Sequence, residues 1–336
     1  MSFATGVGSH PGDDARGYDE AVRVVFGELG EDQVPYLPEL PGRGAAASMT
    51  GRTLAVVAEL AADLQPSGWR LTGSWGAGVD QRRARSLLAQ DLDAVEQRGQ
   101  GFAGPFKVQV CGPWTLAATT QLPRGERVLS DHGARRELGE ALAAGLTEHL
   151  AVVRRRLPGM TRLICQLDEP LLGAVLAARV PTASGYGRYR AIDLPEARSL
   201  LEEVTGAITE AGAQTWVHSC AADLPFGVLP PVTGLLVDPR LLDAEGIDAL
   251  ANHLDQQGTV VLGLLNSVAP ESWSADGSDR AATDAALRWL DMVGFDPIEV
   301  SDRLGISASC GFAGATQPWA RNTLGLASRV ARNLSV

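Results

Sequence analysis

The chain has 336 residues, of which 45% are hydrophobic and 21% are charged, a composition that excludes disordered, collagen-like and low-complexity proteins. Its net charge of −11 argues against nucleic acid as a partner, because binding to phosphates needs a basic surface. A chain of this length can bury most of its apolar surface without disulfide bonds, either as two ordinary domains or as one (β/α)₈ barrel with insertions.

Eight short apolar runs predict buried parallel strands, because strands covered on both faces are apolar along their whole length. In chain order these runs are residues 3–9, 34–38, 106–111, 162–167, 214–218, 234–238, 259–265 and 305–310. Apolar residues at helical spacing predict helices in several of the gaps, at residues 45–64, 87–97, 133–157, 195–211 and 280–293. Strands that alternate with helices indicate a parallel sheet.

The predicted fold is therefore α/β, with a single (β/α)₈ TIM-type barrel favoured over a doubly wound open sheet. Residues 70–75 are surplus to the barrel pattern and predict an extra hairpin or loop insertion after the second strand. Residues 181–193 predict a long loop after the fourth strand. No internal repeat and no Gly/Ser-rich linker is evident, so we expect one barrel domain over residues 1–336.

No apolar run reaches the roughly 18 residues that a membrane span requires. The first residues also lack the basic and apolar regions of a signal peptide, which predicts a cytoplasmic protein with no membrane partner. The four cysteines are too few and too scattered for a disulfide framework. Packing, metal binding and catalysis are the roles that remain for them.

Residues able to bind a metal collect at the carboxyl ends of the predicted strands, where a (β/α)₈ barrel places its active site. His218 and Cys220 end the fifth strand and can converge, because residues i and i+2 of an extended segment face the same side. Cys310 ends the eighth strand, and barrel closure can bring it towards the fifth. One His and two Cys suit Zn²⁺, with Asp238 as the natural fourth ligand. The alternative is a hydrogen-bonded core histidine beside two inert thiols.

At these residues the chain resembles the C-terminal catalytic barrel of cobalamin-independent methionine synthase, in a short single-barrel form. His218, Cys220 and Cys310 match the H-x-C and C-G motifs of that family. The resemblance implies that they hold a zinc ion that binds the thiol of homocysteine. The family's fourth ligand is usually Glu, and Asp238 is the nearest match in this sequence.

Residues 166–170, Gln-Leu-Asp-Glu-Pro, resemble the family motif whose Asp binds the amino group of homocysteine, which implies a catalytic and substrate-binding role for Asp168. Ser9, in a Gly-Ser-His-Pro sequence, resembles the family residue that contacts the substrate carboxylate, and Glu39 resembles a second amine-binding residue. Three simpler interpretations stay open. Asp168 could cap a helix, Ser9 could be a turn residue, and Glu39 could be a solvated loop carboxylate.

The folate-binding part of the family pattern is altered in this chain. Thr119 lies near the position where the family has a folate-stacking Trp, and residues 263–267 lack the Asp and His of the family's D-x-H-S motif. The resemblance thus implies a zinc-dependent methyltransferase that converts homocysteine to methionine. A methylated corrinoid protein fits the pattern better than folate as the methyl donor. An alkyltransferase for another small thiol and a non-catalytic thiol-binding barrel are the alternatives.

Overall fold

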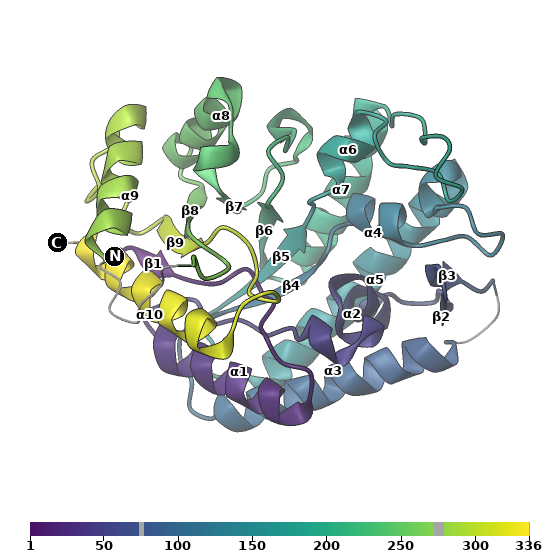
Figure 1. Cartoon of the computed structure of the whole chain (residues 1–336), viewed down its shortest axis with the longest axis horizontal. Coiled ribbons are helices and arrows are strands. Elements are labelled where there is room, and N and C mark those ends of the chain that lie inside the picture. The colour runs from purple at the N-terminus through teal and green to yellow at the C-terminus, as the bar shows by residue number, and fades with distance from the viewer. Residues whose placement is uncertain (74–76, 272–278, 336) are drawn as a thin grey trace.

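The computed structural model describes residues 1–73, 77–271 and 279–335, and its main feature is a curled parallel sheet of seven strands (Figure 1). The strand order is β1-β9-β8-β7-β6-β5-β4. The strands are β1 (Phe3–Ala4), β4 (Pro105–Cys111), β5 (Arg162–Asp168), β6 (Gln214–Ser219), β7 (Gly234–Val237), β8 (Thr259–Leu265) and β9 (Leu304–Ala308). Seven of the predicted strands thus form within a single sheet, with bounds that differ by a few residues.

Ten α-helices lie in the described part of the chain, and most of them surround the sheet (Figure 1). They are α1 (Ala15–Leu29), α2 (Met49–Val56), α3 (Val79–Arg98), α4 (Pro113–Thr119), α5 (His132–Arg156), α6 (Leu172–Leu176), α7 (Leu194–Glu210), α8 (Ala244–Asp255), α9 (Arg280–Val293) and α10 (Gln317–Asn333). The predicted helix over residues 280–293 is confirmed at both ends. Asp14 and Asp131 cap α1 and α5 by accepting hydrogen bonds from backbone N–H groups of the first turn.

The prediction of a regular strand over residues 34–38 is wrong, because this segment makes a single isolated bridge, between Tyr36 and Lys107. It contains two prolines, which have no N–H group to donate to a ladder. The segment nevertheless joins the two edges of the sheet. Val34 N donates to the carbonyl of Ala4, and Leu37 N donates to the carbonyl of Lys107, both at 2.9 Å. The curled sheet with this closing segment is consistent with a TIM-like barrel.

The helix predicted over residues 45–64 is also partly wrong, since α2 ends at Val56. The chain then forms a separate antiparallel hairpin of β2 (Ala62–Gln65) and β3 (Gly68–Leu71). Gly68 has a φ of 119°, which glycine adopts readily in a tight turn. The extra hairpin or loop predicted over residues 70–75 overlaps the end of this hairpin at residues 70 and 71, and residues 74 and 75 lie outside the described residues. The loop predicted over residues 181–193 is irregular, as expected.

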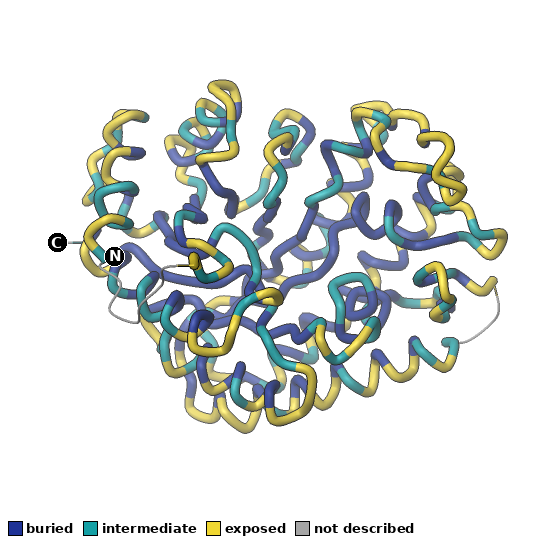
Figure 2. Tube along the Cα trace, viewed as in Figure 1, coloured by how far each residue is buried: buried dark blue, intermediate teal, exposed yellow. Residues whose placement is uncertain are grey.

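Two hydrophobic cores stabilise the sheet. The larger core lies between the sheet and the helices, and the strands of the sheet are correspondingly buried along most of their length (Figure 2). The smaller core fills the interior of the curled sheet and consists of Phe3, Val7, Val34, Ile164, Trp216, Leu236 and Val261. This inner apolar layer fills the barrel interior on the amino-terminal side of the strand ends. The polar side chains of the same strands follow it in sequence and therefore lie at the carboxyl ends.

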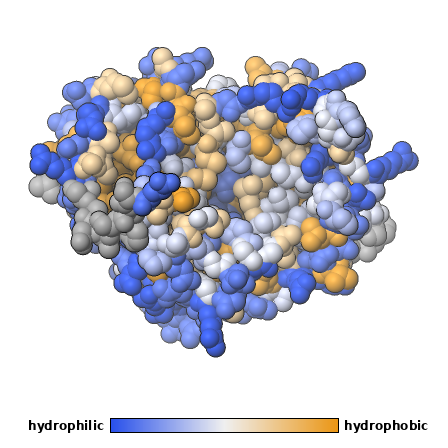
Figure 3. Space-filling view, viewed as in Figure 1, coloured by the Kyte–Doolittle hydropathy of each residue, from blue (hydrophilic) through white to orange (hydrophobic). Residues whose placement is uncertain are grey.

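The exterior is formed mainly by the polar faces of the helices. Figure 3 shows hydrophilic side chains around the edge of the visible face, with hydrophobic areas near α8 and α9 and at the right of the view. The two chain ends lie side by side, and Ser2 N donates to Ser335 Oγ at 2.8 Å. In the part of the chain that the structure describes, no helix combines the length and the apolar character needed to span a membrane.

Candidate metal and substrate site

Three of the four predicted metal ligands meet at one point. The ligand atoms of His218, Cys220 and Cys310 all lie within 4.8 Å of one another. His218 is on β6 and Cys220 follows that strand directly, whereas Cys310 follows β9. Strands β6 and β9 are not neighbours in the sheet, so its curl brings the two sulfur atoms together.

His218 is held in one orientation by the neighbouring strand. Its Nδ1 lies 2.9 Å from the carbonyl oxygen of Leu236 on β7, so Nδ1 carries the proton and donates. The ring is buried, with 2% of the residue exposed. Nε2 is therefore the nitrogen left to bind a metal, and a hydrogen bond of this kind is the usual way in which a ligating imidazole is oriented.

The two cysteines form an unequal pair. The Cys220 thiol donates to Cys310, which lowers the pKa of Cys310 to about 4, and His218 acts in the same direction. The same hydrogen bond, together with burial, raises the pKa of Cys220 above its usual range. One nitrogen and two sulfur atoms, with one sulfur readily deprotonated, form a donor set that fits Zn²⁺.

Asp238, the predicted fourth ligand, is not part of this group. Its Oδ2 lies 2.7 Å from Nη2 of Arg240, and its Oδ1 accepts from Nε and from the backbone N of the same residue at 2.8 and 2.9 Å. Asp238 also precedes a 3₁₀ turn, Pro239–Leu241, whose first turn it caps. The carboxylate is thus committed to its own turn, which the sequence did not indicate.

Asp168 is the last residue of β5 and lies in register with His218 on β6. It is buried, and Oδ1 accepts a hydrogen bond from Gln166 Nε2 at 2.7 Å. Burial raises the pKa of Asp168 to about 7, while His218 and Lys107 oppose that shift. Asp168 caps no helix, so the simpler interpretation of this residue does not apply.

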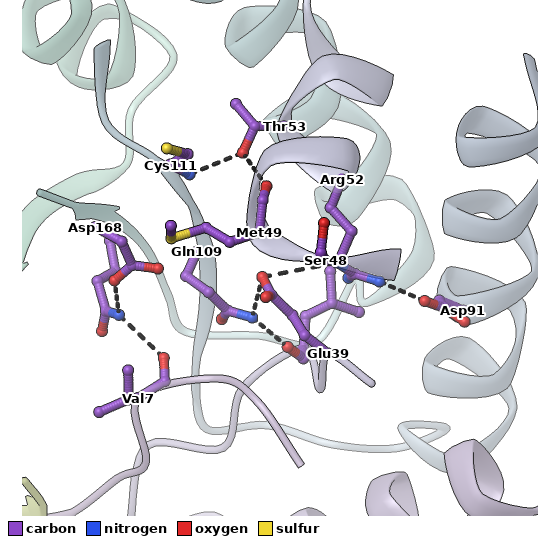
Figure 4. A network of polar contacts seen from close by, with 12 residues as sticks. Val7, Glu39, Ser48, Met49, Arg52, Thr53, Asp91, Gln109, Cys111 and Asp168 are labelled. Atoms are coloured by element: carbon purple, nitrogen blue, oxygen red, sulfur yellow. Dashed lines mark hydrogen bonds and ion pairs between the residues drawn. The ribbon is translucent and has the colours of Figure 1, made fainter. Parts of the chain in front are cut away.

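Glu39 is a second buried carboxylate, with 4% of the residue exposed, so it is not a solvated loop residue. Its Oε1 accepts from Gln109 Nε2 at 3.1 Å and lies 3.6 Å from Arg52 Nε (Figure 4). Arg52 in turn pairs with Asp91 on α3. Burial raises the pKa of Glu39, and Arg52 and Gln109 oppose that shift.

Ser9 connects these carboxylates to the cysteine side of the site. It forms an isolated parallel bridge with Glu39, and its carbonyl accepts from Phe312 N at 2.8 Å. A Cβ atom added at Gly311 would lie 2.0 Å from Ser9 Oγ, so the hydroxyl packs directly against the residue after Cys310. The predicted substrate and metal residues are therefore contiguous around this loop.

Lys107 is a site residue that the sequence reasoning missed. It is the only lysine of the chain and is fully buried in the middle of β4. Its Nζ donates to the carbonyl of Val7 at 3.0 Å and lies 5.1 Å from the ring centroid of Tyr36. Burial lowers its pKa to about 8, while Asp168 and Glu39 oppose that shift. A lysine inside a strand made mostly of apolar residues was the available signal.

Glu169, next to Asp168, has a structural role that was also missed. Its two oxygen atoms accept from the backbone N of Trp114 and of Thr115, each at 2.9 Å, and Oε2 also accepts from Thr115 Oγ1 at 2.6 Å. These N–H groups belong to the first turn of α4, where they have no partner within the helix. Of the two adjacent acids, Asp168 lies at the candidate site, whereas Glu169 caps the first turn of α4.

Comparison with known proteins identifies the family of the chain and two solved structures with a similar fold. The family model described as the catalytic domain of cobalamin-independent synthase matches residues 128–333. No curated protein matches the chain. A solved B12-independent methionine synthase from Shewanella sp. W3-18-1, in complex with selenomethionine, has a TM-score of 0.60 at 12% identity, with 98% of this chain and 97% of that chain covered.

A solved methyltransferase from Methanosarcina mazei has a TM-score of 0.58 at 13% identity, with 100% of this chain and 94% of that chain covered. At such low identity the two structures show a shared fold. The family model carries more information, since it spans more than half of the chain and includes Asp168, His218, Cys220 and Cys310. The chain therefore belongs to the family of the cobalamin-independent synthase catalytic domain.

Proposed function

We propose that this protein is a zinc-dependent methyltransferase that methylates the thiol of homocysteine to form methionine. The observation that carries the proposal is the meeting of His218, Cys220 and Cys310 at the same strand ends as Asp168. A thiol-binding metal set beside buried carboxylates suits a substrate that has both a thiol and an ammonium group. Family membership supports a methyltransferase, and the Shewanella neighbour is described as a methionine synthase in complex with selenomethionine.

His218, Cys220 and Cys310 would hold the zinc ion and leave a position for the substrate. When bound, zinc would lower the pKa of a thiol that coordinates it, so that the thiol is present as the more nucleophilic thiolate. We leave Asp238 out of the ligand set because its carboxylate is paired with Arg240. The Nδ1 hydrogen bond of His218 orients the imidazole and leaves Nε2 for this role.

The chain's own residues would hold the amino-acid end of the substrate. Asp168, assisted by Glu39, would accept the ammonium group, and its burial strengthens that interaction because water is excluded. Ser9 would donate its hydroxyl proton to the substrate carboxylate. Fixing the ammonium and carboxylate groups directs the sulfur of homocysteine towards Cys220 and Cys310. Holding the reacting atom in a defined orientation lowers the entropic part of the activation barrier.

In the transfer itself, the thiol loses its proton, a bond forms between sulfur and the methyl carbon, and the bond between that carbon and the donor breaks. Methyltetrahydrofolate and a methylated corrinoid protein are the two donors to be tested. The altered residues at 119 and 263–267 argue for the corrinoid. Nothing in the comparisons supports a corrinoid partner, and the Shewanella neighbour is described as B12-independent.

The test is single-turnover formation of methionine by zinc-loaded protein, with homocysteine and either methylcobalamin or methyltetrahydrofolate, followed by mass spectrometry. We expect methionine with at least one donor and none from the Cys310→Ser variant. Cys165→Ser is the matched control, because Cys165 is buried in β5 outside the metal group. Homocysteine binding without any methyl transfer would favour a thiol-binding barrel. Absence of zinc and homocysteine binding would overturn the proposal.

A further inference from the structure

Two buried glutamines lie directly below the site carboxylates. Gln109 on β4 and Gln166 on β5 are partners in the parallel register, so they lie side by side on one face of the sheet. Their exposed fractions are 4% and 0%. Each is also two residues from the end of its strand, which places both side chains one layer beneath the carboxyl ends.

Gln166 links a backbone carbonyl to Asp168. Its Nε2 donates to the carbonyl of Val7 at 3.0 Å and to Oδ1 of Asp168 at 2.7 Å. Val7 lies in the segment that follows β1. The amide therefore links the Asp168 carboxylate to the backbone of the segment that follows β1.

Gln109 repeats this arrangement for Glu39. Its Nε2 donates to the carbonyl of Leu37 at 2.7 Å and to Oε1 of Glu39 at 3.1 Å (Figure 4). The four partners of the two amides are two backbone carbonyl oxygens and two carboxylate oxygens. A carbonyl oxygen can only accept a hydrogen bond, and so can an ionised carboxylate. The NH₂ groups must therefore face them, and the amide orientation is determined by the network.

Neither glutamine is explained by packing alone. The Oε1 atoms of Gln109 and Gln166 are both buried and have no hydrogen-bond partner among the described residues. An apolar side chain of similar size would fill the same space without an unsatisfied oxygen. Compared with such an apolar side chain, a glutamine provides two N–H donors at each position. One donates to a backbone carbonyl and the other donates to a carboxylate.

The chemistry of the donor matters as well. Arg52 lies 3.6 Å from Glu39 and partly offsets its charge, whereas Asp168 forms no ion pair with a lysine or arginine among the described residues. A neutral amide orients a carboxylate and leaves its negative charge available. Gln109 and Gln166 thus prepare Glu39 and Asp168 to accept a positively charged group from above.

We infer that Gln109 and Gln166 are positioning residues, which orient Glu39 and Asp168 as a paired acceptor for the ammonium group of an amino-acid thiol. The inference rests on the proposed function and makes it more specific. It predicts that the two amides determine selectivity for thiols that carry an ammonium group over thiols of the same length that lack one.

The experiment compares two ligands, homocysteine and 4-mercaptobutanoate, which differ only in the amino group. Dissociation constants are measured by calorimetry on zinc-loaded wild type, Gln166→Met and Gln109→Met. We expect each variant to weaken homocysteine binding roughly tenfold or more, because hydrogen bonds to charged groups are the stronger ones. Binding of 4-mercaptobutanoate is expected to stay within about twofold, with unchanged zinc content.

Gln214→Met is the matched control, since Gln214 begins β6 at the far end of the strand from the carboxylates. If a methionine variant does not fold, Gln166→Glu keeps the side-chain shape and replaces the donor by an acceptor, with the same selective loss expected. Equal weakening of both ligands, or unchanged homocysteine binding, would overturn the inference. Failure of the wild type to bind homocysteine would instead overturn the proposed function, and this inference with it.

Discussion

The sulfur atoms of Cys220 and Cys310 lie within 4.8 Å of each other, although the strands that they follow, β6 and β9, are separated by β7 and β8 in the sheet. A flat sheet would hold these residues apart, because each strand adds about 4.8 Å of separation. The curl of the sheet is therefore a condition for the metal group. Any change that opens the barrel would separate its ligands.

Replacement of either cysteine is expected to remove the metal. For Cys220→Ser and Cys310→Ser we expect zinc affinity to fall by at least roughly 100-fold, since losing a residue that merely orients a ligand already costs about 10–100-fold. Competition with a chromophoric chelator measures the affinity. The buried Cys165 provides the control, and Cys165→Ser is expected to keep the zinc. Equal affinity in all three variants would mean that the thiols are inert.

Asp238 provides the complementary test, because the sequence and the geometry give different expectations. With its carboxylate bound to Arg240, Asp238→Ala is expected to leave zinc affinity within about threefold. Unfolding by urea should show a loss of about 1 kcal/mol, the usual contribution of a cap. A drop in zinc affinity of tenfold or more would instead establish Asp238 as a ligand.

The sequence predicted the parts of the fold that depend on local patterns. Apolar runs identified seven strands of the sheet, and periodicity located α9 at its observed bounds. The pattern was misleading over residues 45–64, where Gln81 of α3 binds Ala62 N and the carbonyl of Leu54 and so stabilises the start of a hairpin. Contacts of this kind join distant segments, and periodicity carries no information about them.

In the candidate site, too, the sequence predicted what depends on local position and missed what depends on contacts between segments. Strand-end positions predicted that His218, Cys220 and Cys310 lie close together, because parallel strands place their last residues at one edge, and the structure brings the three together. Asp238 follows the same rule, but its turn brings Arg240 within reach, and this depends on the local backbone. The roles of Lys107 and Gln109 depend on which segments face them across the barrel, so the sequence alone could not assign them.

Binding of homocysteine is expected to depend on the ionisation of Asp168. Burial raises the pKa of its carboxyl group to about 7, so the group is largely protonated at pH 6 and ionised at pH 8. The ammonium group of the substrate requires the ionised form. Affinity should therefore rise with pH up to about 7 and then level off, with a change of up to roughly tenfold per pH unit on the acidic side.

Calorimetric titrations between pH 5.5 and about 8.5 check this dependence for zinc-loaded protein. Asp168→Asn is the matched variant, for which we expect weak binding with a flatter profile across the same range. The ligand 4-mercaptobutanoate reports any pH effect on the thiol end alone. A profile for homocysteine that is the same in wild type and Asp168→Asn would contradict the role of Asp168.

A substitution at Glu169 can distinguish its structural role from the substrate-binding role proposed for Asp168. Both of its oxygens accept backbone N–H groups of α4, so Glu169→Gln would turn an NH₂ group towards a donor. We expect the free energy of unfolding in urea to fall by about 1–3 kcal/mol, the range for an unsatisfied buried group. Thr115→Val removes only the hydroxyl contact with Oε2 and is expected to be milder. Homocysteine affinity should be nearly unchanged in folded Glu169→Gln, whereas an effect on affinity without loss of stability would assign Glu169 to the site.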